Sequence, residues 1–267
     1  MSAPVDAPGT TTGTGRSAAS RSSSSRPATA SLWLLTSVMT RAAQGRLRLA
    51  LSVAAALALG GLGLVLRAQA DATGVSEDLV ATLVATLVLT LYAPLISLVQ
   101  AAAVVGDLRD DGTLVYLWLR PVPRWKLALA AALAVLVRSA PLAVLAAVAL
   151  ALAAGGSGEL VVASAYAALL GCVGYAGLFS FLGLAVRRAL VWGLVYVLVW
   201  EGVVGTFGAL PARLAVSSYS TSLLAELGGT PAPAQGVGLA WAWAGPVLIA
   251  MVALVVSHRR LVRGEVA

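Results

Sequence analysis

The sequence predicts an all-α integral membrane protein with six transmembrane helices, an N-terminal surface helix and a short cytoplasmic helix between the second and third spans. Of its 267 residues, 60% are hydrophobic and only 11% are charged. Several apolar runs reach the ~20 residues that are needed to cross about 30 Å of hydrocarbon. The ~10-residue alternation that is typical of a transmembrane barrel does not occur. The spans are therefore predicted to be helical.

The residues before the first span divide into two parts. Residues 1–30 are rich in Ser, Thr, Ala, Gly and Pro, a composition that cannot form a packed core. We predict that they form a disordered cytoplasmic tail. In residues 31–48, apolar side chains such as Leu35 and Met39 recur at helical spacing between polar ones, which predicts an amphipathic helix on the membrane surface.

The rest of the chain, residues 49–267, is predicted to form the six-span transmembrane domain. Three of the apolar runs are longer than a minimal span, which favours helices that tilt or extend past the membrane. The spans are predicted at about 49–66, 79–105, 127–153, 160–186, 189–210 and 238–257.

Charge predicts the orientation of these spans. With the N-terminus inside, fifteen of the 18 Lys and Arg residues fall on inner segments and two on outer segments. Because cytoplasmic loops carry an excess of Lys and Arg, we predict a multi-pass protein of the cell inner or plasma membrane with both termini cytoplasmic. The net charge of +7 then reports orientation, and no nucleic-acid partner is expected.

Residues 106–126, "GDLRDDGTLVYLWLRPVPRWK", interrupt the apolar runs with a dense polar segment. Asp111 or Thr113 can cap a helix by accepting backbone N–H bonds. The run "TLVYLWL" then gives about two turns that are apolar almost all round. Pro121 and Pro123 end the helix, since neither has a backbone N–H and each disfavours helix in the preceding residue.

A short apolar helix on the wet side of a membrane needs something to bury it, and two interpretations remain open. In one, a solvated loop dips into the headgroups with its basic side chains on lipid phosphate. In the other, the helix seats its hydrophobic face in the groove of a soluble partner. The basic side chains are Arg109, Arg120, Arg124 and Lys126.

This segment resembles the characteristic segment of the ABC-2-type permeases, which are the membrane subunits of ATP-binding-cassette exporters. The residues that match are Gly112, Thr113, Leu114, Pro121, Val122 and Arg124, with Asp107, Asp110 and Asp111 on the acidic side. The resemblance implies a coupling helix, which carries motion from an ATP-hydrolysing subunit to the spans. One departure is the third span, which lacks the Lys that the family often has near its start. A second is that the acid preceding the Gly-Thr pair cannot be registered uniquely among the three aspartates.

The resemblance also implies partners: an ATP-binding-cassette ATPase subunit, a second permease half that is a copy or a relative of this chain, and membrane lipids. No G-x-x-x-x-G-K-[ST] sequence occurs, so we expect ATP and Mg to be bound by the partner, with no cofactor in this chain. The single His and single Cys predict no metal site and no catalytic residue, hence no enzyme activity by itself. The implied ATPase-docking residues are Asp107, Arg109, Asp110, Asp111, Gly112, Thr113, Leu114, Leu117, Arg120, Pro121 and Arg124.

Two ionisable residues lie within the predicted spans. Arg138 is in the third and Glu201 in the fifth, at similar depths and with opposite signs, so we predict an intramembrane charge pair. The alternatives are that each faces a wet cavity alone, or that either reaches the interface. Gly202, Gly205 and Gly208 recur at every third position beside Glu201, which permits close approach of another helix, either within the chain or from a second copy.

The external segment 211–237 contains Leu223, Leu224 and Leu227 at helical spacing, which predicts an amphipathic helix on the outer surface. The resemblance implies a lid or re-entrant element there, and an inert connector is the alternative.

The function that the sequence favours is a permease subunit of an exporter, coupling ATP hydrolysis in a separate subunit to export of an unidentified substrate. Two alternatives stay open: a non-transporting membrane scaffold or assembly factor, and a stand-alone secondary transporter. The second has less support because no inverted repeat and no pair of broken helices occurs in matching halves.

Overall fold

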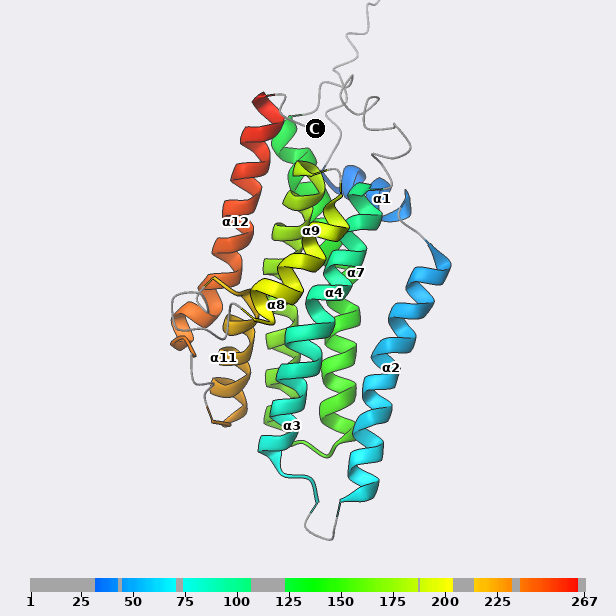
Figure 1. Ribbon diagram of the computed structural model, residues 1–267, viewed down its shortest axis with the longest axis vertical. Helices are drawn as coiled ribbons and strands as arrows, with labels where there is room; N and C mark the ends of the chain where they lie inside the picture. Colours follow the sequence, from blue (N-terminus) through cyan, green and yellow to red (C-terminus); the bar gives the residue numbers. More distant parts are fainter. Residues whose placement is uncertain are drawn as a thin grey trace, which may run out of the picture.

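The fold, seen in a computed structural model, is a bundle whose long helices run side by side (Figure 1). The described residues form helices and no strands. They are residues 32–42, 45–70, 74–106, 123–186, 188–203, 214–231 and 236–263.

The helices named η are π-helical stretches that continue a neighbouring α-helix. In chain order the helices are α1 (Leu32–Ala42), α2 (Arg46–Gln69), α3 (Glu77–Leu83), η1 (Val84–Tyr92), α4 (Ala93–Ala101), η2 (Ala102–Gly106), α7 (Arg124–Ala153), α8 (Gly158–Ala185), α9 (Ala189–Val195), η3 (Tyr196–Glu201), α11 (Val216–Gly228) and α12 (Leu239–Arg263).

Five helices in the described part of the chain are long and apolar enough to cross a membrane. Four of them are α2, α7, α8 and α12, and the fifth is the continuous stretch Glu77–Val105. Each overlaps one of the predicted spans. The predicted span at 189–210 corresponds to the shorter apolar helix Ala189–Glu201, and residues 204–210 lie outside the described residues. Six spans therefore remain a prediction.

The centre of the bundle is α8, which packs against α7, α11, α12 and α4. The buried positions of α7 are mostly alanines, among them Ala143, Ala146 and Ala147, all fully buried. Small side chains let helix backbones approach closely, and in lipid this contact replaces the hydrophobic effect as the source of association. The alanine-rich sequence of α7 thus permits close packing against its neighbours, α8 among them.

The outer positions belong to α2 and α12, which lie on opposite sides of the bundle (Figure 1). In each, only 22% of the most apolar window is buried, against 67% in α8. Their exposed side chains are large and apolar, for example Leu57 and Leu64 on α2 and Val252 on α12. These faces are suited to lipid tails or to another membrane helix.

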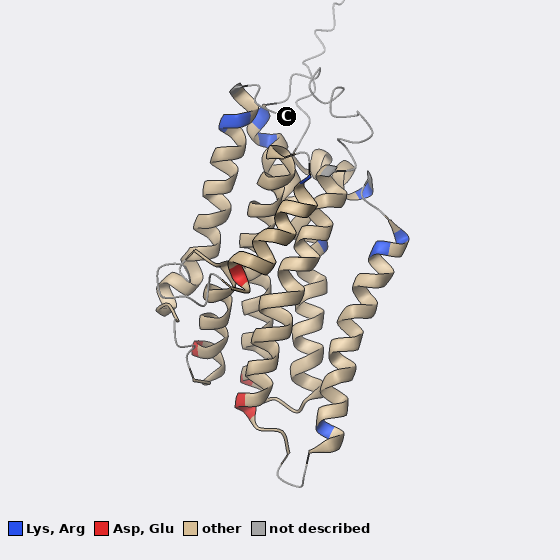
Figure 2. Ribbon diagram, viewed as in Figure 1, with Lys and Arg blue, Asp and Glu red and all other residues tan. Residues whose placement is uncertain are grey.

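Charges separate to the two ends of the bundle (Figure 2). Lys and Arg lie mainly at the end where α12 terminates, while acids such as Glu77 and Glu159 lie at the other end, at the starts of α3 and α8. We call these the basic end and the acidic end. The separation agrees with the charge bias that predicts cytoplasmic termini.

The region predicted as one surface helix, residues 31–48, contains the separate helix α1 and the start of α2. Leu35 and Met39 on α1 are buried, while Trp33 is 78% exposed, so the helix has one packed face and one open face. The packed face lies against α7. The predicted tail, residues 1–30, lies outside the described residues.

The helix in the segment 211–237, which was predicted to lie on the outer surface, is more deeply packed than an amphipathic surface helix. α11 contacts α8 and α12, and its Leu223 and Leu224 are buried together with Ser217, Ser220 and Ser222. It ends at Gly229, whose φ of +64° is a left-handed conformation that favours glycine. The helix therefore forms part of the bundle wall in its acidic half.

Gly63 and Gly61 provide a matched test of the close contact between α2 and α7. A Cβ at Gly63 would lie 2.8 Å from the Leu150 carbonyl oxygen, whereas a Cβ at Gly61 would have no neighbour within 4 Å. We expect Gly63→Ala to lower stability by about 1–3 kcal/mol through overpacking. Gly61→Ala should cause no loss, because alanine favours helix over glycine. The measurement is the unfolding midpoint of the detergent-solubilised protein; equal midpoints for both variants would contradict the contact.

Candidate functional site

The predicted docking segment is only partly covered by the structure. Residues 107–122 lie outside the described residues, and with them all the predicted docking residues except Arg124. On one flank, Val105 at the end of η2 packs against Gly183 near the end of α8. On the other, α7 begins at Arg124, whose Nη1 donates a hydrogen bond to the backbone carbonyl of Leu261 on α12. Both flanks therefore lie at the basic end of the bundle.

Arg138, the charge predicted within the third span, joins three helices. Its Nε donates to Oε1 of Gln100 on α4 at 2.7 Å, and its Nη1 donates to the backbone carbonyl of Thr40 on α1 at 3.1 Å. Thr40 is in the last turn of α1, where carbonyl groups lack helical partners and a cation is favourable. We call Arg138, Gln100 and Thr40 the arginine clamp.

The arginine clamp joins the two helices that flank the predicted docking segment. Gln100 is on the helix that leads into residues 107–122, and Arg138 is on the helix that follows them. Gln100 is only 1% exposed, so its hydrogen bond with Arg138 is made inside the bundle. Movement of one flank relative to the other must change this contact, which couples the flanks to each other and to α1.

Glu201 forms a second polar centre, at the end of η3. The side chain is only 5% exposed, and its Oε2 accepts a hydrogen bond from the Tyr175 hydroxyl of α8. The Tyr196 and Ser217 side chains and the backbone of Val216 also interact with the carboxylate. Within the described ranges, Oε1 has no partner of good hydrogen-bonding geometry. This carboxylate centre joins α8, η3 and α11.

The two charges predicted to pair have separate partners in the structure. Arg138 binds Gln100 and Thr40, and Glu201 binds Tyr175. No hydrogen bond or ion pair joins Arg138 to Glu201 in the described part of the chain. The helix α9, which leads into Glu201, packs on α4 and α8, and these two helices in turn pack on α7. Each charge is thus accommodated by its own surroundings.

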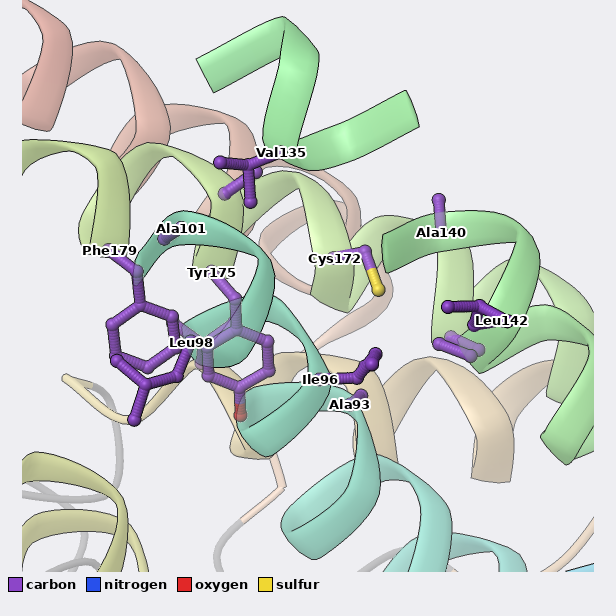
Figure 3. Packing of buried hydrophobic residues seen from close by; sticks show 14 of the residues in the cluster. Ala93, Ile96, Leu98, Ala101, Val135, Ala140, Leu142, Cys172, Tyr175 and Phe179 are labelled. Atoms are coloured by element: carbon purple, nitrogen blue, oxygen red, sulfur yellow. The ribbon is translucent and has the colours of Figure 1, made fainter. Parts of the chain in front are cut away.

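The carboxylate centre adjoins a packed apolar core. The rings of Tyr175 and Phe179 stack with their centroids 5.8 Å apart, and Leu98 of α4 lies beside them (Figure 3). Cys172, one turn before Tyr175, is buried with its Sγ 3.9 Å from the Ser97 hydroxyl. The described residues contain no cluster of three or more His, Cys, Asp or Glu side chains that could hold a metal ion.

The predicted glycine face is described only at its first residue. A Cβ at Gly202 would lie 2.5 Å from the Leu198 carbonyl oxygen of the preceding turn, so a side chain there would require the local backbone to shift. Gly205 and Gly208 lie outside the described residues, and their contact with a second copy stays a prediction.

Sequence reasoning missed the partners of both charges. Gln100 and Tyr175 are polar residues within apolar runs, which is the signal by which they could have been found, because an unpartnered polar group is costly in hydrocarbon. Sequence reasoning also missed Tyr196 and Ser217, the further polar neighbours of Glu201.

Comparison with known proteins agrees with this architecture. A search of curated proteins finds no match to the chain. The family model described as ABC-2 family transporter protein matches residues 46–224, which is more than half of the chain and runs from the start of α2 into α11. The matched range contains the docking segment, the carboxylate centre and two of the three arginine-clamp residues. This chain therefore belongs to the ABC-2 family of transporter proteins.

Proposed function

We propose that the chain is the permease subunit of an exporter, which couples ATP hydrolysis in a separate ATP-binding subunit to export of a substrate across the cell membrane. In this proposal, the chain has six spans with both termini in the cytoplasm and pairs with a second permease half. The docking segment binds the ATPase at the basic end of the bundle. The chain itself supplies no nucleotide site.

The observation that carries this proposal is the family match over residues 46–224. The arginine clamp supports it, because it joins the helices on both sides of the docking segment. The separation of charge supports the orientation, because the docking segment then lies on the side where ATP is available.

The mechanism follows from differential affinity between two states of the spans. ATP favours the closed arrangement of two ATPase subunits, and docking segments attached to them move together. If outward-open spans fit the closed ATPases better, ATP shifts the population toward that state. Within this chain, the shift passes from residues 107–122 into α4 and α7, whose relative position is held by Gln100 and Arg138. The same clamp carries the displacement to α1 through Thr40.

Purification from native membranes tests the proposal directly. We expect the tagged chain to bring down a polypeptide with a G-x-x-x-x-G-K-[ST] motif and to show ATPase activity only in that complex. Substituting the motif lysine of the partner should remove the activity, because this lysine binds the nucleotide phosphates. The chain purified alone and placed in vesicles should hydrolyse no ATP.

Two results would contradict the proposal. Reproducible purification without any ATPase would favour a scaffold. Uptake of a substrate by vesicles that contain only this chain, driven by an ion gradient without ATP, would favour a secondary transporter.

A further inference from the structure

The acidic half of the bundle contains a small open cavity between α11 and the two helices α3 and η1. Its volume is about 280 Å³, just below the ~300–1,000 Å³ of typical ligand sites, so it suits a small molecule. Asp78, Thr82 and Ala85 line it from α3 and η1, and Thr221 and Leu224 line it from α11. We call this cavity the α11 pocket.

The two walls of the α11 pocket run in opposite directions. α3 begins at the acidic end, so Asp78 lies at the rim and Ala85 lies roughly two turns deeper in the bundle. α11 ends at the acidic end, because a Cβ at Gly228 would meet Leu160 in the first turn of α8. An occupant therefore has its polar group at the rim beside Asp78 and its apolar body deeper, along Ala85 and Leu224.

The polar groups around the α11 pocket are mainly hydrogen-bond acceptors. The hydroxyls of Thr82 and Thr221 donate to backbone carbonyls of their own helices, at 2.7 and 2.9 Å. A hydroxyl has a single proton, so these two can only accept a hydrogen bond from an occupant. Just beyond α11, the Thr230 N–H donates to the Ala225 carbonyl, and Pro231 has no N–H.

The Asp78 carboxylate adds a negative charge, and no ion pair joins it to a Lys or Arg of the described residues. Arg67, in the last turn of α2, lies over the connection between α7 and α8, because a Cβ at Gly155 would be 3.8 Å from its Nε. Val80 faces the same connection, since a Cβ at Gly156 would be 3.5 Å from its Cγ1. Asp78 is two residues from Val80 and so about 200° round the helix. The carboxylate is therefore on the opposite side of α3 from this arginine.

We propose that the α11 pocket binds a small organic ammonium ion, with its N–H groups at Asp78 and its apolar body along Ala85 and Leu224. An ammonium group has donors and no acceptor, which matches the acceptors around the pocket. The other acids of the acidic end, Glu77 among them, create a negative field that raises the local concentration of cations (Figure 2). The occupant contacts both walls and so holds α11 against α3 and η1.

Binding of a defined probe measures this site without requiring transport. The full chain is placed in nanodiscs of phosphatidylcholine, and cyclohexylammonium is titrated and followed by saturation-transfer difference NMR, with empty nanodiscs as the background. Cyclohexanol has the same ring without the charge, and it should bind roughly fivefold more weakly, the upper end for an exposed ion pair. N,N,N-trimethylcyclohexylammonium keeps the charge but has no N–H, and it should also bind more weakly than cyclohexylammonium.

Two substitutions in α3 test the residues of the site. Asp78→Asn should weaken binding of cyclohexylammonium roughly fivefold through loss of the charge. Thr82→Trp should abolish binding by filling the pocket, and because Thr82 is exposed the buried core stays intact. The matched controls are Glu77→Gln, which removes the adjacent charge, and Leu79→Trp, which enlarges a 46% exposed side chain outside the pocket lining. Both controls should bind the probe as the unchanged protein does.

Several outcomes would overturn the proposal. Equal binding by Asp78→Asn and the unchanged protein would show that this carboxylate does not hold the probe. An equal loss in Glu77→Gln would replace the site by the general field of the acidic end. Full binding by Thr82→Trp would place the probe elsewhere, and equal binding of cyclohexanol or of the trimethyl probe would remove the requirement for an N–H donor with a positive charge. None of these results depends on whether an ATPase binds the chain.

Discussion

Replacing Thr113, Leu114 and Leu117 together by aspartate is expected to abolish association with the ATPase while leaving the chain inserted in the membrane. The proposed docking helix has about two turns of apolar side chains, which must be buried against the partner. Losing two buried leucines costs about 3–6 kcal/mol. Burying unpaired carboxylates costs several kcal/mol more. The sum of these two costs is comparable to the ~8 kcal/mol of binding free energy that corresponds to micromolar affinity.

Co-purification of the ATPase and its activity in the complex measure this effect. The control places the same three charges in the N-terminal region, as Ala18→Asp, Ala19→Asp and Ser20→Asp, where the family match does not extend. That variant should bind the ATPase normally, whereas the docking variant should behave as the chain alone. Normal binding by the docking variant would show that this segment is a membrane-surface loop and that the ATPase docks elsewhere.

Five of the six predicted spans correspond to long apolar helices of the described residues, because hydrocarbon imposes a length on a spanning run. The apolar run at 127–153 corresponds to α7 at Arg124–Ala153, and the run at 160–186 corresponds to α8 at Gly158–Ala185. The start of α8 is set locally, since Ser157 accepts a hydrogen bond from the Leu160 N–H. The length of a span and the cap of a helix depend on neighbouring residues along the chain, so both can be predicted from the sequence.

The depth of α11 could not be predicted in the same way. The helical spacing of Leu223, Leu224 and Leu227 predicted a helix on the outer surface, yet the intervening Ser220 and Ser222 donate to backbone carbonyls of their own helix and are buried. A Cβ at Gly171 would lie 2.6 Å from the Ser220 hydroxyl oxygen, so the helix packs where α8 has no side chain. Whether a serine is satisfied by its own helix or by water is decided by packing, which periodicity does not report.

Part of the candidate site could also be predicted from the sequence, and part could not. A charge within an apolar run is conspicuous, so Arg138 and Glu201 could be singled out from the sequence. Their depth along the spans was also available, because each residue adds 1.5 Å. The direction in which the Arg138 and Glu201 side chains point depends on how α4 and α8 pack against the helices that carry these two residues. The partners Gln100 and Tyr175 were therefore visible only in the structure.

Removing the Tyr175 hydroxyl is expected to destabilise the chain, because a buried carboxylate then loses a hydrogen-bond donor. Tyr175→Phe takes the hydrogen bond from a buried carboxylate, and hydrogen bonds to charged groups contribute about 1.5–3 kcal/mol. Glu201→Leu removes the charge but leaves the Tyr175 hydroxyl buried without this acceptor, at a cost of about 1–3 kcal/mol. In the combined variant neither member of this pair is left stranded, although Tyr196 and Ser217 still lose the carboxylate as a partner.

The double-mutant cycle therefore predicts a non-additive result. The loss in the combined variant should be smaller than the sum of the single losses by about 0.5–3 kcal/mol, the range for residues in direct contact. The measurement is reversible unfolding in mixed micelles. Tyr166→Phe is the matched control, since it removes a hydroxyl from the same helix at a side chain that is 48% exposed and packs edge-on against Trp243. It should change stability by less than about 0.5 kcal/mol. Additive losses in the cycle would mean that Tyr175 and Glu201 do not stabilise each other, and that the carboxylate depends on η3 and α11 alone.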